Sequence, residues 1–590
     1  MEKIRISLAC LLLMLMLPAA AQKAISPIRV NQLGYYPEAA KIAIVIVPAG
    51  TPAQRFYILK LNRQDTLYRG STGNTLASDY SSVHTQVIDF SGLRQEGSFV
   101  IAIPGLPLSY PFQVKPHVHH DAAAALIKGF YYQRVSMPLD IAYAGKWARP
   151  AGHPDTAVLI HPSAASPQRP AGSRIASPGG WYDAGDYNKY IVNSGITMGT
   201  LLSAYEDLAP YFDTLKTNIP ESVNRIPDLL DEVLYNLRWM LSMQDPFDGG
   251  VYNKCTNAAF DGMVMPGVTK APRYVVQKGT AATLDFAAVM AQASRVYKRF
   301  NKALPGLSDS CLHAAVRAWQ WADRNPSVAY NQNRMNKQYE PQVSTGGYGD
   351  KTFTDERFWA GAELLATTGE RQYYTVLAPY LPDSLSIPSW SGVHLLGCYT
   401  LLRFERALST VPATDISALR KRFIRFADRL LPNVQQSAFR TVMGQNRRDF
   451  IWGSNSVAAN QGIVLINAYL LTKEKKYIAG ALTNLDYLLG RNATGYSFIT
   501  GIGSFSPMHP HHRPSVADGI AEPVPGLLAG GPNPGRQDSV YYEFVEPETA
   551  YADDDGSYAS NEIAINWNAP AVYLAAALEA LEGEAGYTKD

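Results

Sequence analysis

The chain has 590 residues, of which 53 are Lys or Arg and 51 are Asp or Glu, so its net charge is only +2. So balanced a charge creates no overall positive field, and we therefore expect no nucleic-acid partner. Hydrophobic residues make up 46% of the chain and charged residues 18%, which excludes a largely disordered protein. The length predicts about two to four domains.

The N-terminus is typical of a secretory signal peptide. Basic residues precede an apolar run over residues 6–17, and Ala19, Ala20 and Ala21 follow it. The run is shorter than the roughly 20 apolar residues that a membrane-spanning helix needs. We therefore expect residues 1–21 to be removed, and we predict a secreted or periplasmic protein without a membrane span.

Short apolar runs alternate with turn residues in the first part of the mature chain. Examples are residues 41–47, 56–59 and 98–103. Alternation in short runs of this kind is typical of antiparallel β-strands. It predicts an all-β sandwich of the immunoglobulin type over residues 25–115.

After Pro116 the apolar residues recur three and four positions apart, for example across residues 226–241 and 456–471. This period predicts helices, which recur at intervals of about 40 residues. Long loops rich in Gly, Pro and aromatic residues separate them. We expect an all-α toroid over residues 118–586 that carries its functional side chains on these loops. Since no low-complexity linker precedes it, the two domains should pack together.

The first loop with candidate catalytic residues covers residues 179–190, where Asp183 and Asp186 lie between aromatic side chains. Only two small residues separate the acids, so both carboxyl groups can face one space. There, one acid can raise the pKa of the other or orient it through a water molecule. The structural alternative is that one Asp caps the helix predicted to begin near Ile196.

A second candidate loop contains three His residues within positions 509–512, followed by Arg513. Zinc binding is one interpretation, but prolines interrupt the segment, no Cys is nearby and Arg513 would repel a cation. A neutral His511 and Arg513 are better suited to hydrogen-bond hydroxyl groups or a carboxylate. We therefore predict no metal ligands here.

The third candidate segment covers residues 551–570. Its acidic run at 553–555 resembles half of a calcium loop, but no acidic residue closes the loop at the required spacing. Glu562 lies among apolar and aromatic residues, including Tyr558. Partial burial there would raise the pKa of Glu562 and keep it protonated near neutral pH, as a general acid requires.

Together the three segments fit the hydrolysis of a glycosidic bond. This reaction uses one protonated carboxyl group and one ionised carboxylate, and aromatic rings hold the sugars. The aromatic candidates for substrate binding are Tyr182, Trp452 and Tyr558. Glu562 and Asp186 lie far apart in the sequence, so only a fold that brings its ends together, such as a closed toroid, would pair them.

Several segments, in the same order, resemble glycoside hydrolase family 9, in the group of cellulases with an N-terminal immunoglobulin-like domain. Residues 29–35 resemble the start of that domain, and residues 179–190 resemble the loop that carries the family's catalytic base. Further similar segments are residues 248–252, 280–287, 358–364, 452–455, 486–492, 511–513, 530–536 and 553–569. The resemblance covers nearly the whole mature chain and implies an (α/α)6 barrel as the all-α domain.

The resemblance implies hydrolysis of β-1,4-linked glucans with inversion at the anomeric carbon. Asp186 would be the general base that deprotonates water, Asp183 would help to hold that water, and Glu562 would be the general acid. Three further residues would bind substrate or support the site: His511, Arg513 and Asp553. One departure from the family is Phe505, where a polar or basic residue is usual, and it concerns a single subsite contact.

The resemblance implies no catalytic cofactor and leaves a structural calcium ion open, without ligands that can be assigned. We expect a monomer that cuts cellulose, xyloglucan or mixed-linkage glucan internally. One alternative is an end-acting glycosidase on short oligosaccharides. Another is a non-catalytic glycan-binding protein on the same scaffold. The presence of Asp183, Asp186 and Glu562 favours an enzyme.

Overall fold

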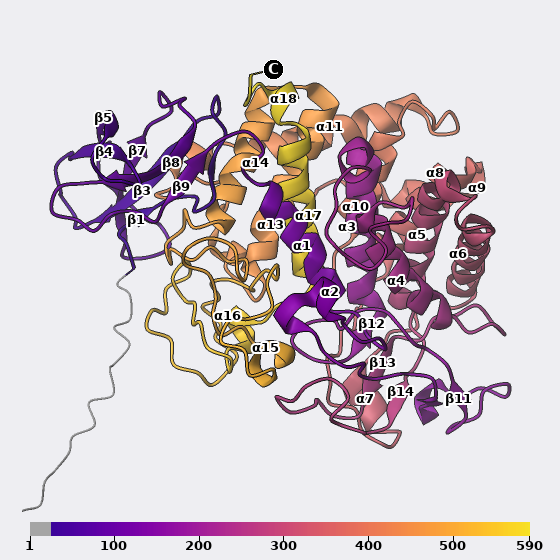
Figure 1. Ribbon diagram of the computed structural model, residues 1–590. Coiled ribbons are helices and arrows are strands. Elements are labelled where there is room, and N and C mark those ends of the chain that lie inside the picture. The colour runs from indigo at the N-terminus through magenta and orange to yellow at the C-terminus, as the bar shows by residue number, and fades with distance from the viewer. Residues whose placement is uncertain (1–24, 590) are drawn as a thin grey trace, which may run out of the picture.

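The computed structural model describes residues 25–589, in which a β-rich N-terminal domain is followed by a larger helical domain (Figure 1). The predicted signal peptide, residues 1–21, lies outside the described residues. No helix within residues 25–589 combines the length and the apolar character that crossing a membrane requires.

The N-terminal domain consists of two sheets. The first has the strand order β1 (Ile28–Arg29), β3 (Ile42–Val47), β7 (His84–Asp89) and β6 (Leu76–Ala77), and the second has the order β2 (Gly34–Tyr35), β9 (Phe112–Val114), β8 (Gly97–Ala102), β4 (Arg55–Lys60) and β5 (Thr66–Ser71). A shared apolar core, which includes Val45, Phe56 and Ile101, joins the sheets. Each of the three apolar runs that predicted strands overlaps one of these strands.

Strand β3 explains why its apolar run is continuous rather than alternating. Ala43, Val45 and Val47 face the core of the β-rich domain. Ile44 points the other way, into an apolar cluster with Phe439 of the helical domain. A strand buried on both faces needs apolar residues at every position. The predicted packing of the two domains is therefore confirmed.

The helical domain contains long helices that differ in how much of their surface is buried. The longer ones are α1 (His120–Tyr132), α3 (Ile191–Phe212), α4 (Asp228–Ser242), α5 (Thr280–Tyr297), α6 (Leu307–Arg324), α8 (Thr354–Thr368), α9 (Arg371–Leu377), α10 (His394–Arg403), α11 (Ala413–Leu430), α13 (Ser454–Thr472), α14 (Lys475–Leu488) and α17 (Ile565–Ala580). In α5 and α17 nearly every residue is buried, which marks central helices. In α11 only one stripe is buried, and it contains Leu419, Phe423, Phe426 and Leu430.

The helical domain is not all-α as predicted, because it contains a small sheet among its loops. Its strand order is β11 (Arg174–Ile175), β10 (Val158–Ile160), β14 (Arg273–Val275), β13 (Lys254–Asn257) and β12 (Lys189–Tyr190). Strands of two to four residues are too short to produce a recognisable period in the sequence. Figure 1 shows β12, β13 and β14 at the same end of the domain as the short helices α15 (Arg513–Ala517) and α16 (Tyr558–Asn561).

Candidate active site

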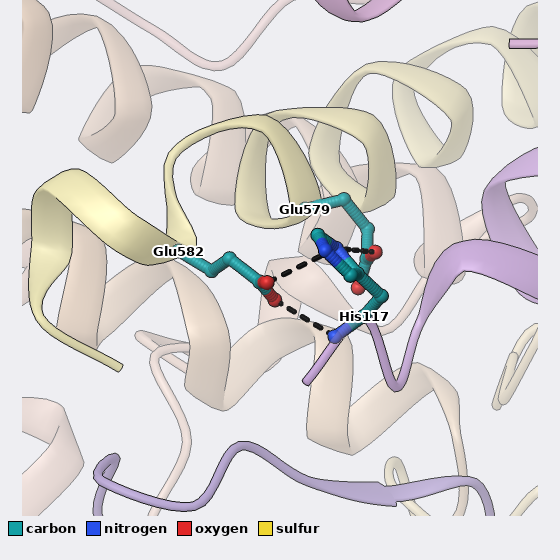
Figure 2. Close-up of side chains that lie close together, drawn as sticks. All are labelled: His117, Glu579 and Glu582. Carbon is teal, nitrogen blue, oxygen red and sulfur yellow. Dashed lines mark hydrogen bonds and ion pairs between the residues drawn. The ribbon is translucent and has the colours of Figure 1, made fainter. Parts of the chain in front are cut away.

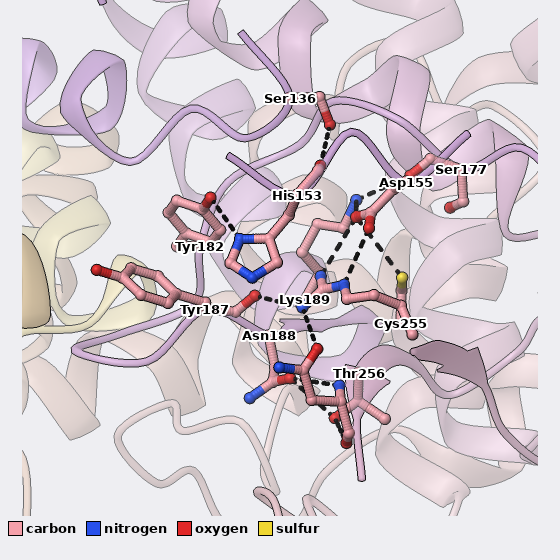
Figure 3. A network of polar contacts seen from close by, with 12 residues as sticks. Ser136, His153, Asp155, Ser177, Tyr182, Tyr187, Asn188, Lys189, Cys255 and Thr256 are labelled. Carbon is pink, nitrogen blue, oxygen red and sulfur yellow. Dashed lines mark hydrogen bonds and ion pairs between the residues drawn. The ribbon is translucent and has the colours of Figure 1, made fainter. Parts of the chain in front are cut away.

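The loop that carries Asp183 and Asp186 is anchored from below by buried charges. Lys189 in β12 donates hydrogen bonds to the carbonyl oxygens of Ser177 and Gly179, and its Nζ lies 2.8 Å from Asp155 Oδ2 (Figure 3). Burial opposes the ionisation of Asp155, but the charges of Arg273 and Lys189 outweigh it and lower the pKa of Asp155 to about 2. These buried ion pairs therefore hold the loop in place.

The structure does not place Tyr182 as predicted. Only 1% of this residue is exposed, and its hydroxyl lies 2.9 Å from His153 Nδ1 (Figure 3). Its ring also packs against Tyr187, with 4.8 Å between the ring centroids. Tyr182 therefore supports the loop from behind and offers no free face to a sugar. An extended segment alternates its side chains between two faces, and this residue lies on the inner one.

Asp186 is held by donors that favour its ionised form. Its Oδ2 accepts a hydrogen bond from the hydroxyl of Tyr190 (3.1 Å), one from the backbone N–H of Asn188 (3.3 Å) and one from the Asn188 side-chain amide. Hydrogen bonds to a carboxylate stabilise its charge. Since all the bonds that described residues make to Asp186 reach Oδ2, Oδ1 is free to accept a proton from water.

Asp183 lies beside Asp186 in a different environment. Both of its oxygens accept hydrogen bonds of 3.0 Å from Asn193 in α3, and Oδ2 also accepts one of 3.0 Å from the hydroxyl of Tyr348. Burial and the charge of Asp186 nevertheless raise the pKa of Asp183 well above its usual range. The two neighbouring acids therefore differ in surroundings: burial favours the protonated form of Asp183, and the donors around Asp186 suit a carboxylate.

Backbone pairing brings the C-terminal segment to this loop. Ala184 forms an antiparallel bridge with Ala564, and the N–H of Ile565 donates to the carbonyl oxygen of Asp183 at 2.8 Å. The same C-terminal segment also pairs with the loop over residues 509–513, which we call the His loop. Here the N–H of His511 donates to the carbonyl oxygen of Asn561 at 3.0 Å. These bonds place Glu562 between the two loops.

Glu562 has the environment of a proton donor. Burial raises its pKa well above the usual range, and the nearby charges of Asp186 and Asp183 raise it further. Arg513 and a hydrogen bond from the backbone of Gly185 act in the opposite direction without reversing the shift. Because Glu562 interacts with both acids, the structure brings all three predicted carboxyl groups into one site.

His511 and Arg513 tie the loops together. Nδ1 of His511 lies 2.6 Å from the carbonyl oxygen of Asp555, so this nitrogen carries the ring proton. The other nitrogen, Nε2, can then accept a hydrogen bond. Burial lowers the pKa of His511, so its ring is neutral. Arg513 is largely buried, and it donates to the carbonyl oxygens of Asp261 (2.9 Å) and Gly185 (2.7 Å). These contacts of Arg513 therefore position the loop over residues 179–190, which we call the base loop after the role predicted for Asp186.

The close approach of the two loops also explains a glycine between the two acids of the base loop. A Cβ atom placed on Gly185 would lie only 2.1 Å from the carbonyl oxygen of His511. No other residue fits at this distance without moving the backbone. Gly185 thus permits the contact between the base loop and the His loop.

Asp553 connects the His loop to the segment of Glu562. It accepts hydrogen bonds from the backbone N–H groups of Met508 (2.8 Å) and His509 (2.9 Å), and from the side-chain amide of Asn561 (3.1 Å). Its position next to Glu562 is that of a supporting residue.

Two aromatic side chains extend from His511 toward solvent. The ring of Tyr558 lies 5.9 Å from that of His511, and the ring of Trp452 lies 5.5 Å from that of Tyr558. Trp452 is 41% exposed. Tyr558 is half-buried, and aromatic rings that reach solvent in this way can stack on sugar rings. Phe505, in contrast, packs against Tyr496 at a centroid distance of 4.0 Å and stacks on Tyr110 of the N-terminal domain at 5.7 Å.

Sequence reasoning missed the donors that hold the acids. Asn188 and Tyr190 follow Asp186 at intervals of two, which places them on one face of an extended segment, so a signal was present. Tyr348 and Asn193 approach Asp183 from other parts of the chain. No pattern near Asp183 could have identified Tyr348.

A buried lysine behind Asp186 was also missed. Lys254 donates hydrogen bonds to Gln332 (2.7 Å), Thr345 (2.9 Å) and the carbonyl oxygen of Gly346 (2.7 Å). Burial lowers its pKa to about 7, although the charge of Asp186 opposes this shift. The N–H of Gly346 in turn donates to the hydroxyl of Tyr190 at 3.0 Å. Lys254 thus belongs to the network that fixes the donors of Asp186.

Comparison with known proteins agrees with this geometry. The sequence model of glycosyl hydrolase family 9 matches residues 119–575, and that of the cellulase N-terminal ig-like domain matches residues 23–107. The chain is 46% identical to the xyloglucan-specific endo-β-1,4-glucanase of Bacteroides ovatus, over 94% of each chain. It is 31% identical to endoglucanase D of Acetivibrio thermocellus, over 93% of this chain and 83% of that protein.

Solved structures show the same relationship. A GH9 structure from Bacteroides ovatus superposes with a TM-score of 0.89 at 44% identity, covering 94% of this chain and 99% of that one. A thermostable endoglucanase of Alicyclobacillus acidocaldarius superposes with a TM-score of 0.82 at 31% identity, with the same coverage. The chain therefore belongs to glycosyl hydrolase family 9, and its β-rich N-terminal domain is of the cellulase immunoglobulin-like type.

Proposed function

We propose that this protein is an inverting endo-β-1,4-glucanase and that xyloglucan is its preferred substrate among the plant-type β-glucans. The observation that carries the proposal is the pair of carboxyl groups in one site, Asp186 held by donors to a carboxylate and Glu562 held in its protonated form. The choice of xyloglucan rests on the 46% identity to a relative named for that activity.

In the proposed reaction a water molecule attacks the anomeric carbon from the side opposite the leaving group. Oδ1 of Asp186 takes a proton from this water as the new C–O bond forms. Glu562 gives its proton to the glycosidic oxygen as the old C–O bond breaks, so charge does not accumulate on either side. A single displacement of this kind releases a product with the α configuration. No cofactor takes part.

The surrounding residues orient the reactants. Asp183 lies beside the base and helps to hold the water. The free Nε2 of His511 accepts a hydrogen bond from a sugar hydroxyl near the scissile bond, and Arg513 holds the base loop in place. Trp452 and Tyr558 stack on sugar rings of the glucan that lie further from the scissile bond. Asp553 keeps the His loop next to the acid.

We also propose that the helices form an (α/α)6 barrel. The support is the order in which the helices pack: α3 packs against α5 and α17, α8 against α5 and α10, and α13 against α17. The inner helices of such a barrel would be α3, α5, α8, α10, α13 and α17, and the outer ones α1, α4, α6, α9, α11 and α14. We place the domains at residues 25–115 and 118–586. The mature protein is proposed to be a secreted or periplasmic monomer, with a structural calcium ion left as an open prediction.

The function can be tested on a panel of soluble β-glucans. The protein is incubated with xyloglucan, mixed-linkage glucan and a soluble cellulose derivative, and viscosity and product sizes are followed over time. A rapid fall in viscosity, fastest with xyloglucan, is the expected result, and NMR should detect the α-anomer first. Steady release of one small sugar would indicate an end-acting enzyme, and binding without hydrolysis would indicate a glycan-binding protein. A first product with the β configuration would contradict inversion.

A further inference from the structure

A second cluster of ionisable side chains lies at the other end of the helical domain. His117 follows β9 in the segment that connects the two domains, Glu579 lies in the last turn of α17, and Glu582 begins the short helix α18 (Glu582–Ala585) (Figure 2). From its first residue, Ile565, to Glu579, helix α17 rises about 21 Å, and this length separates the cluster from the segment of Glu562. Figure 1 shows α18 opposite α15 and α16.

In each glutamate one oxygen is anchored by backbone or side-chain donors and the other lies near the His117 ring. Oε1 of Glu579 accepts hydrogen bonds of 2.8 Å from the hydroxyl of Tyr36 and from the N–H of His119. Oε2 of Glu579 is buried and receives no hydrogen bond from any residue in the described part of the chain, although only 2% of Glu579 is exposed. Oε2 of Glu582 accepts from the N–H of His117 at 3.0 Å, which directs Oε1 to the His117 ring.

Three possible ligand atoms therefore converge. Nδ1 of His117 lies 3.0 Å from Oε1 of Glu582 and 3.5 Å from Oε2 of Glu579, and all three atoms lie within 4.8 Å of one another. Bonds of about 2.0–2.2 Å to a tetrahedral zinc ion place neighbouring ligands about 3.4 Å apart. Two of the three separations already have this size. A ring nitrogen among the ligands favours zinc over calcium, which prefers oxygen atoms alone.

The cluster places two buried carboxyl groups beside a ring that reaches solvent. Only 2% of Glu579 and 4% of Glu582 are exposed. The His117 side chain is 69% exposed, so an ion can enter from solvent and water can complete its coordination. The anchored oxygens fix the carboxylates from behind, as the partners of metal ligands do in known sites.

We propose that Nδ1 of His117, Oε2 of Glu579 and Oε1 of Glu582 bind a divalent transition-metal ion of the zinc class. The ion fastens the segment between the domains to the C-terminal helices. It has no part in hydrolysis, because the active site lies at the far end of α17. The alternative source of positive charge is a proton on His117, and the following experiment separates the two.

The purified protein is freed of metal with a chelator and then titrated with Zn²⁺ by calorimetry, while thermal unfolding is measured with and without the ion. We expect one site per chain and a rise in the unfolding temperature, because the ion binds the folded state. The test variant is Glu582→Gln, which keeps an acceptor for the His117 N–H but removes a carboxylate ligand. The matched control is Glu584→Gln, which changes an exposed glutamate in the same helix.

In Glu582→Gln we expect Zn²⁺ affinity at this site to fall about 100-fold and the thermal shift to disappear. Glu584→Gln should bind like the unaltered protein. Equal binding by both variants, or no Zn²⁺ site in the unaltered protein, would overturn the proposal and leave a protonated His117 as the counter-ion. A His117→Ala variant that loses the site confirms the nitrogen ligand. One that keeps it would refute the ligand set.

Discussion

Asp186 and Glu562 carry the same functional group, yet the protein gives them opposite surroundings. Oδ2 of Asp186 receives hydrogen bonds from Tyr190 and from both the backbone and the side chain of Asn188. Among residues 25–589 no side chain donates a hydrogen bond to Glu562, and both burial and the neighbouring acids favour its protonated form. The comparison teaches that local donors and desolvation, rather than the residue type, distinguish the proposed base from the proposed acid.

Removing the base should have the largest effect. We expect Asp186→Asn to lower kcat on xyloglucan by roughly 10³-fold or more, because an amide cannot take a proton from water. A substrate with an activated leaving group should not rescue this variant, since water must still be deprotonated. Initial rates on both substrates provide the measurement, with the exposed Asp309→Asn as control. Rescue by the activated substrate would show that Asp186 is not the base.

Removing the acid should have a smaller effect that depends on the substrate. Glu562→Gln should lose roughly 10²- to 10⁴-fold in kcat on xyloglucan but recover most of its rate on an activated aryl glycoside, which needs little protonation. The loss of activity at high pH, where Glu562 gives up its proton, should be absent from this variant on the activated substrate. The exposed Glu96→Gln serves as control. If Glu562→Gln still lost activity at high pH on the activated substrate, the general acid would be another residue.

These charged residues could be predicted because their chemistry is visible in short segments. The same segments did not reveal which side chains face inward. Tyr182 is an aromatic beside the acids, but it packs against His153 and Tyr187 behind the loop. Composition and spacing contain no record of which face of an irregular loop is buried, because tertiary contacts decide it.

Residues that act across long sequence distances could not be predicted either. Tyr348 reaches Asp183, and Lys254 reaches the network behind Asp186, only because the helices bring their loops to one end of the domain. The small sheet that holds β12 was missed since its strands are too short to show a period. The fold itself was easier to predict, because amphipathic helices and alternating strands repeat their signal over many residues.

The donors of the base provide the next test of the comparison. Tyr190→Phe removes one hydrogen bond to Asp186 and leaves the ring in place. A hydrogen bond to a charged group is worth about 1.5–3 kcal/mol, so we expect kcat to fall roughly 10- to 100-fold with little change in KM. Tyr57→Phe in the N-terminal domain is the control. An unchanged kcat in Tyr190→Phe would show that the hydrogen bond from Tyr190 does not support Asp186.

The smallest expected effect concerns stability rather than rate, and it follows from the raised pKa of Glu562. Below the unfolded pKa of about 4.3 this group is protonated in both states and its ionisation does not affect folding. Above that pH only the unfolded chain ionises freely, so the protein loses stability until the pH reaches the folded pKa.

Glutamine cannot ionise, and the free energy of unfolding of Glu562→Gln, relative to the unaltered protein, should therefore rise with pH across this window. Denaturant unfolding at a series of pH values measures the slope. A flat difference, such as we expect for Glu96→Gln, would mean that Glu562 ionises as readily in the folded protein as in the unfolded chain, and it would then lack the property that distinguishes it from Asp186.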